Sequence, residues 1–371
     1  MRQVWATVVA LAVGCSGDDP ATGNTTDTGS TDVDLEALVE ELAAPGDYRV
    51  GYRKVPVSWS DALLTGGEVR ELQVSVWYPT EDTSGDDVSY QDAFPADEVL
   101  GGAALAGDDL PVAVFSHGHQ AYGEAASFLM EHLATHGWVV VAPDHLGNLV
   151  WDGDARDTEI YLQRPLDLVA VLDWLDDPAG DELGGRLAPG RLGMGHSFGG
   201  YTLHAVAGAS FDPAVVAACD DGSPFCSTMT PELAERFADG VAEQRFTALV
   251  AMDPGDHRLF GEGLGDVVAP ELYMSADFDD EERVDSLPFW TDLDHPDDVW
   301  ASFPGLAHNG FTDVAGALDP PGVQPPEEGW YLVRASVLAW GRGTLLSDAG
   351  SKALFEEDSP LAGESLDLRY R

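Results

Sequence analysis

The sequence predicts an α/β domain with a mostly parallel sheet covered by helices on both faces. Short apolar segments alternate along the chain with longer segments of helical periodicity. Several of the apolar segments are continuous, as strands buried on both faces are. The chain has 371 residues, which is enough for one large domain with a sizeable core.

Each element follows from its local pattern. The folded part begins near Tyr48, and Glu71–Tyr78 alternates as a strand that Pro79 should end. Further strands are expected at Pro111–Phe115, Trp138–Ala142, a short segment starting at Arg191, Thr247–Met252, Glu271–Met274 and Trp300–Phe303. Helices are expected at Leu35–Leu42, Ala125–His136, Arg164–Leu175, Tyr201–Ala209 and Trp330–Trp340. Polar clusters follow the carboxyl ends of the strands, where ligands bind in such sheets.

The charge balance excludes several classes of partner. The chain has 18 Lys and Arg against 66 Asp and Glu, a formal net charge of −48. Nucleic acid would be repelled, and direct adsorption to anionic lipid is disfavoured. We interpret the excess acid as a strongly solvated surface. The sequence has no GxGxxG fingerprint, phosphate-binding loop or HExxH motif, and we expect neither a metal nor an organic cofactor.

The N-terminus has the features of an export signal. Residues 4–13 form an apolar run that is too short to span a bilayer. Small residues then precede Cys15, a pattern that resembles the cleavage motif of bacterial lipoproteins, although Ala12 stands where that motif favours leucine. We expect residues 1–14 to be a signal peptide and 15–34 to be a disordered tether with a lipid on Cys15. An ordinary secretory signal with an incidental cysteine is the alternative.

The strongest motif is Gly195-His-Ser-Phe-Gly199, which stands between an apolar strand and an apolar helical run. Gly-x-Ser-x-Gly in this context is a nucleophile elbow. A sharp turn lifts the Ser197 hydroxyl clear of the sheet, and a Cβ at either glycine would crowd that turn. The following helix points its N-terminus at the place where an oxyanion would form. The motif predicts an α/β-hydrolase fold in residues 35–371 with Ser197 as the nucleophile.

The base and the acid should follow Ser197 in the order acid, then histidine. His308 follows the last predicted strand and precedes the final helix, so we expect it to be the base. Two strand ends offer an acid: Asp253 ends one strand, while Asp277 and Asp279 end the next. The order of elements leans toward the later strand. The acidic turn 277–282 is expected to be solvated rather than to bind calcium, since no calcium-loop pattern is present.

An oxyanion hole needs two donors near the nucleophile. The first should be the backbone N–H of Phe198, the residue after the nucleophile. The second should come from the loop after the strand at 111–115, where we choose His119. His117 and Gly118 are expected to let this loop approach the elbow.

The chain resembles the platelet-activating-factor acetylhydrolase group of α/β-hydrolases over about residues 48–340. The resemblance is carried by residues 74–79 (VSVWYP), 115–118 (FSHG), 137–145 (GWVVVAPDH), 195–200 (GHSFGG), 251–254 (AMDP) and 307–313 (AHNGFTD). In that group, and in the similar chlorophyllases, the acid follows the earlier strand, which implies Asp253. Polyester hydrolases and cutinase-like enzymes place it after the later strand, near Asp277 or Asp279. We choose Asp253, because Met252-Asp253-Pro254 is the closer match.

Residues 210–245 depart from that group. This insertion contains Cys219 and Cys226, which we expect to form a disulfide in an oxidising compartment. Thr230 and Pro231 should start a helix within it. The insertion is interpreted either as a surface addition or as a lid over the site.

These features predict a monomeric, lipid-anchored serine ester hydrolase on the outside of a bacterial cell envelope. Its partner would be a small ester, such as a short-chain lipid or phospholipid ester, and its membrane contact would be the anchor alone. A polyester hydrolase is the alternative enzyme. A catalytically silent hydrolase-fold binding module is the alternative of another class, which the presence of both Ser197 and His308 disfavours.

Overall fold

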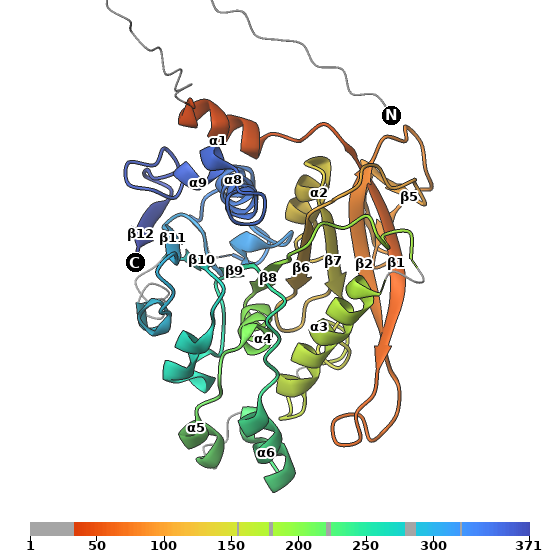
Figure 1. The fold of residues 1–371 in the computed structure, drawn as a ribbon, viewed down its shortest axis with the longest axis vertical. Helices are drawn as coiled ribbons and strands as arrows, with labels where there is room; N and C mark the ends of the chain where they lie inside the picture. The colour runs from red at the N-terminus through yellow and green to blue at the C-terminus, as the bar shows by residue number, and fades with distance from the viewer. Residues whose placement is uncertain (1–32, 154–155, 178–180, 220–223, 279–286, 320) are drawn as a thin grey trace, which may run out of the picture. The chain divides into compact units, whose positions relative to one another are not determined.

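A ten-stranded sheet runs through the middle of the domain in the order β12-β11-β10-β9-β8-β6-β7-β2-β1-β5 (Figure 1). The strands are β1 Arg49–Trp59, β2 Arg70–Thr80, β5 Val99–Gly101, β6 Val112–Ser116, β7 Val139–Pro143, β8 Leu192–His196, β9 Ala248–Met252, β10 Glu271–Ala276, β11 Val299–Phe303 and β12 Asp367–Tyr370. The six strands from β11 to β7 are parallel to one another. A small separate ribbon pairs β3 Ser89–Tyr90 with β4 Phe94–Pro95.

The computed structural model describes residues 33–153, 156–177, 181–219, 224–278, 287–319 and 321–371. Residues 34–371 form one compact unit. The predicted signal peptide, Cys15 and nearly all of the predicted tether lie outside the described residues, as does Asp279 with the rest of the acidic turn after it. Among the described residues, no helix is long and apolar enough to cross a membrane.

Helices cover both faces of the sheet. They are α1 Leu35–Ala43, α2 Ser127–Thr135, α3 Ile160–Asp176, α4 Phe198–Ala207, α5 Pro213–Ala217, α6 Pro231–Asp239, α8 Pro326–Leu345 and α9 Ala349–Ala353. One apolar cluster packs α3 and α4 against the sheet and continues to α6, and a second packs α2 and α8 against its other side and continues to α1 (Figure 1). Every residue of β6, β7, β8 and β9 is buried, which explains their uninterrupted apolar sequences.

The predicted strands and helices are present, and further strands lie at the margins of the sheet. The sequence analysis placed no strand at β1 or β12, which pair antiparallel with β2 and β11. The expected end of a strand at Pro79 was wrong: β2 continues to Thr80, and Pro79 pairs with Val50. Pairing between β2 and β7 stops at Trp77, so a residue without an N–H is tolerated just beyond it.

Candidate active site

Ser197 lies at the turn between β8 and α4, at the centre of the sheet. Its backbone has φ 54° and ψ −123°, a strained conformation for a residue with a side chain. A Cβ at Gly195 would collide with the carbonyl of Gly199, and a Cβ at Gly199 would collide with the carbonyl of Ser116. The turn therefore needs both glycines, as the motif predicts, and it presents Ser197 at the carboxyl ends of the strands.

His308 connects Ser197 to Asp253. Its Nε2 lies 2.9 Å from Ser197 Oγ, and its Nδ1 is hydrogen-bonded to Asp253 Oδ2. The His308 side chain is 44% exposed, so a substrate can reach it. His308 begins a short 3₁₀ turn, η4 His308–Phe311, after β11. The structure thus brings together the serine, the histidine and the acid of the earlier strand.

The other acid considered on the later strand has different partners. Asp277 follows β10, is almost fully buried, and accepts hydrogen bonds from Ser275 Oγ at 2.7 Å and from Ser302 Oγ. Both hydroxyls belong to strands of the sheet, so this carboxylate ties β10 to β11. The order of elements had leaned toward this strand, whereas the hydrogen bond to His308 Nδ1 comes from Asp253.

His196 supports His308, and the sequence analysis did not single it out. Its Nε2 donates to the backbone carbonyl of His308 at 2.9 Å. Burial, together with the neighbouring His308, lowers the pKa of His196 to about 3. His196 is therefore neutral at physiological pH and holds the backbone of His308 in place. Its position as the first variable residue of the Gly-x-Ser-x-Gly motif was the available signal.

Two groups at the elbow could stabilise an oxyanion. Phe198 is the first residue of α4, so its N–H has no partner within the helix. The loop after β6 comes close to Ser197: a Cβ on Gly118 would lie 3.2 Å from Ser197 Cβ. His119 follows in this loop, with its ring centroid 6.3 Å from that of Phe198 in an edge-on arrangement. Of the two residues chosen for the oxyanion hole, Phe198 follows Ser197 in the chain, and His119 follows the glycine that approaches Ser197.

A second hydrogen-bonded Ser-His-Asp chain lies below the elbow. Ser116 Oγ is 2.9 Å from His145 Nε2, and His145 Nδ1 is 2.9 Å from Asp167 Oδ2. All three side chains are fully buried, and burial lowers the pKa of His145 well below its usual value. No substrate can reach this serine, so the chain is a support for the end of β6. Asp167 also accepts from Trp59 and Arg70, which fixes it against β1 and β2.

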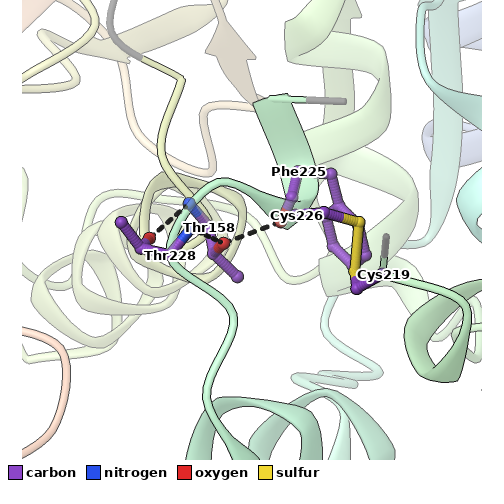
Figure 2. Close-up of a disulfide and its surroundings, with 5 residues drawn as sticks. All are labelled: Thr158, Cys219, Phe225, Cys226 and Thr228. Atoms are coloured by element: carbon purple, nitrogen blue, oxygen red, sulfur yellow. Dashed lines mark hydrogen bonds between the residues drawn. A yellow bond between two sulfur atoms is a disulfide. The ribbon is translucent and has the colours of Figure 1, made fainter. Parts of the chain in front are cut away.

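The insertion at 210–245 is attached to the helical face next to the site. A disulfide joins Cys219 to Cys226, with their Cα atoms 5.0 Å apart (Figure 2). Thr158 Oγ1 donates to the carbonyl of Phe225 at 2.7 Å and accepts from the N–H of Thr228 (Figure 2). The predicted helix is present as α6, and the Thr230 hydroxyl accepts from the N–H of Leu233. The predicted disulfide and the predicted helix start are confirmed.

Within the described ranges, no three His, Cys, Asp or Glu side chains converge as a metal site requires. The greater part of the acidic turn considered for calcium, residues 279–282, lies outside those ranges.

The strand order and the elbow define the fold class, and a solved structure agrees. The chain has the α/β-hydrolase fold. It superposes on a ferulic acid esterase from Streptomyces cinnamoneus with a TM-score of 0.57 and 19% sequence identity, over 83% of this chain and 93% of that one. Residues 84–219 match the family model described as chlorophyllase. The matched residues make up well under half of the chain. No curated protein sequence matches it.

Proposed function

We propose that this protein is a serine-dependent carboxylic ester hydrolase. The observation that carries the proposal is the hydrogen-bonded series Ser197–His308–Asp253 with an accessible histidine. The chlorophyllase family match and the ferulic acid esterase neighbour support ester hydrolysis as the reaction. The strained serine at a strand-to-helix turn is the arrangement that acyl transfer uses.

In this mechanism, Ser197 Oγ attacks the ester carbonyl while His308 Nε2 takes its proton. The tetrahedral oxyanion is bound by the backbone N–H of Phe198 and by that of His119. His308 then gives the proton to the leaving alcohol, and an acyl-enzyme remains. Water, deprotonated by His308, attacks the acyl-enzyme, and the acid and Ser197 are released. Asp253 holds the proton of His308 on Nδ1 and stabilises the imidazolium that forms.

Replacement of Ser197 tests the proposal. Ser197→Ala should abolish hydrolysis of p-nitrophenyl esters and labelling by a fluorophosphonate probe, because both reactions need the hydroxyl. The melting temperature should change little, since alanine keeps the Cβ at this turn and only the hydroxyl is removed. A variant that retains a substantial fraction of wild-type turnover would contradict the assignment. A folded wild type that neither hydrolyses esters nor reacts with the probe would instead indicate a silent binding module.

For the substrate, we propose a small ester such as a short-chain lipid or phospholipid ester. The pairing of His308 with Asp253 rather than with an acid after β10 supports this class over the polyester hydrolases. A series of p-nitrophenyl esters of increasing acyl length should give kcat/KM values that fall as the chain lengthens. Release of soluble product from a polyester film at a comparable rate would favour the alternative.

For the location, we propose a bacterial cell envelope in which the lipid on Cys15 is the membrane attachment. The short apolar run before Cys15 supports this, because cleavage of the signal would remove it and leave the lipid. Cys15→Ala should move the protein from the membrane fraction to the soluble fraction when cells are fractionated. Unchanged partition of the variant would contradict the anchor.

A further inference from the structure

Arg164, on α3, is a buried cation directly below the elbow, and the proposed mechanism does not use it. Its side chain is fully buried, and burial lowers the pKa of the guanidinium to about 9. Removing a charge from water is costly, so a buried ion is weak evidence for stability. The hydrogen bonds that it makes therefore call for a functional explanation.

The guanidinium joins three segments that surround Ser197. On α4, Nε donates to Thr202 Oγ1 at 3.1 Å, and Cζ lies 4.7 Å from the centroid of the Phe198 ring. At the end of β6, Nη2 donates to Ser116 Oγ at 3.3 Å and to the carbonyl of His117, the first residue of the following loop. In the turn after β7, Nη1 donates to Asn148 Oδ1 at 2.6 Å. A planar fork of five donors can serve such separate acceptors at once, whereas a single ammonium nitrogen cannot.

Asn148 extends this network to His119. Because a guanidinium can only donate, the Asn148 atom that faces Arg164 is the oxygen, and its NH₂ group faces His119. The distance from Asn148 Nδ2 to His119 Nδ1 is 2.7 Å. His119 Nδ1 is therefore the acceptor, and the neutral ring carries its proton on Nε2. The network fixes the orientation of His119 as well as the tautomer.

We propose that Arg164 is a positioning residue that sets the oxyanion hole. It contacts the side chain of Phe198 and, through Asn148, that of His119, the two residues whose N–H groups are the proposed donors. It thereby fixes the separation between the elbow and the loop after β6. This inference rests on the proposed ester hydrolysis and deepens it.

The consequence is specific to the transition state. Oxyanion donors act when they lie 2.7–3.1 Å from the position that the anionic oxygen will occupy. A displacement of the loop by about 1 Å can cost roughly 100-fold in rate. The ground-state ester has no oxyanion, so the loss should appear in kcat and not in KM.

Two variants and a control test the inference. Arg164→Lys keeps the charge but loses the fork. Asn148→Asp keeps an oxygen toward Arg164 but places a second oxygen against His119 Nδ1. Arg191→Lys is the control: this arginine also donates to backbone carbonyls in a partly buried setting, at the base of β8, far along the strand from the elbow. For each protein we would measure kcat, KM, the melting temperature and the inhibition constant of a trifluoromethyl ketone, whose adduct with serine carries an oxyanion.

Arg164→Lys should lower kcat about 100-fold and leave KM within about twofold of the wild type. The inhibition constant of the ketone should rise by a factor close to the loss in kcat/KM. Asn148→Asp should lower kcat about tenfold, a smaller loss because Arg164 stays in place. It should also move the ¹⁵N shifts of the His119 ring to those of the Nδ1–H tautomer. Arg191→Lys should match the wild type in all kinetic constants.

The inference is overturned if Arg164→Lys is folded and keeps both kcat and ketone affinity within about twofold of the control. It is also overturned if the loss lies in KM while ketone affinity is unchanged. If Arg164→Lys does not fold, Asn148→Asp decides by the same criteria. If the wild type does not hydrolyse esters, the proposed function fails. If the wild type is active and the variants behave as the control does, only the role of Arg164 fails.

Discussion

At the scale of single residues, the geometry of Asp253 explains why it, and not an acid after β10, is paired with His308. Its φ is 45°, and its N–H donates to the carbonyl of Met274 at 2.6 Å. Carboxylate Oδ1 accepts from the N–H of Ala276 at 3.2 Å, which leaves Oδ2 for His308. The carboxylate is thus held by the neighbouring strand in the orientation that the imidazole needs.

Asp253→Asn should lower kcat by about four orders of magnitude, because an amide favours the wrong tautomer of His308. Asp277→Asn should stay within a few-fold of wild type, because Ser302 and Ser275 keep an acceptor. Steady-state kinetics with p-nitrophenyl acetate would measure both. An active Asp253→Asn beside an inactive Asp277→Asn would place the acid on β10.

At the scale of elements, the site is assembled from loops that follow five strands of the sheet. Ser197 follows β8, Asp253 follows β9, and His308 follows β11. The loop after β6 carries His119, and the turn after β7 carries Asn148. Such loops are positioned by the strands before them, and here the buried chain Ser116–His145–Asp167 and Arg164 add a second level of support.

The insertion is a further element, and its disulfide should stabilise it. The Cys219–Cys226 bond closes a short loop that contains the buried ring of Phe225. Thr158 binds the carbonyl of Phe225 within the loop and the N–H of Thr228 just after it. The double variant Cys219→Ser/Cys226→Ser should lose roughly 2–3 kcal/mol of unfolding free energy if the whole domain unfolds together. Urea unfolding followed by tryptophan fluorescence would measure this loss.

Dithiothreitol gives the matched control for that prediction. It should lower the stability of the wild type to that of the double variant and leave the double variant unchanged. Two alkylatable thiols at these positions in unreduced protein would contradict the disulfide.

At the scale of the whole molecule, stability should depend on pH through buried neutral histidines. Burial is the main cause that lowers the pKa of His132 and His196 to about 3, and it also lowers the pKa of His117 and His145. The unfolded chain binds protons at these residues below its histidine pKa of about 6.5, while the folded chain does not. The histidine contribution to stability is therefore complete above about pH 6.5 and falls as the pH falls toward 3.

The contribution of one such histidine can be tested at His132, which lies away from the candidate site. Its Nε2 lies 2.8 Å from the carbonyl oxygen of Leu42, so this contact joins α2 to α1. His132→Gln keeps a donor but cannot titrate, so the slope of stability against pH should be smaller by about 1.4 kcal/mol per pH unit between pH 4 and 6. Urea unfolding at several pH values measures the slope. Identical slopes in the two proteins would show that this histidine is already protonated in the fold.

The sequence by itself determined the features that depend on neighbouring residues. The parallel strands appear as continuous apolar segments, and the elbow appears as two glycines around Ser197 between a strand and a helix. The fixed chain order of the fold then selected His308. These features are local because burial on both faces and a crowded turn each restrict a few consecutive residues.

Only the tertiary structure decided the features that depend on distant pairing. The strands β1 and β12 are defined by the strands they pair with, and a half-exposed alternating segment carries a weak signal of its own. Asp253 and Asp277 both end apolar strands, and only the course of β9, β10 and the loop after β11 brings one of them to His308. Arg164 looked like an ordinary residue of an amphipathic helix. Its role comes from three segments far apart in the sequence that meet around one guanidinium, which no local pattern records.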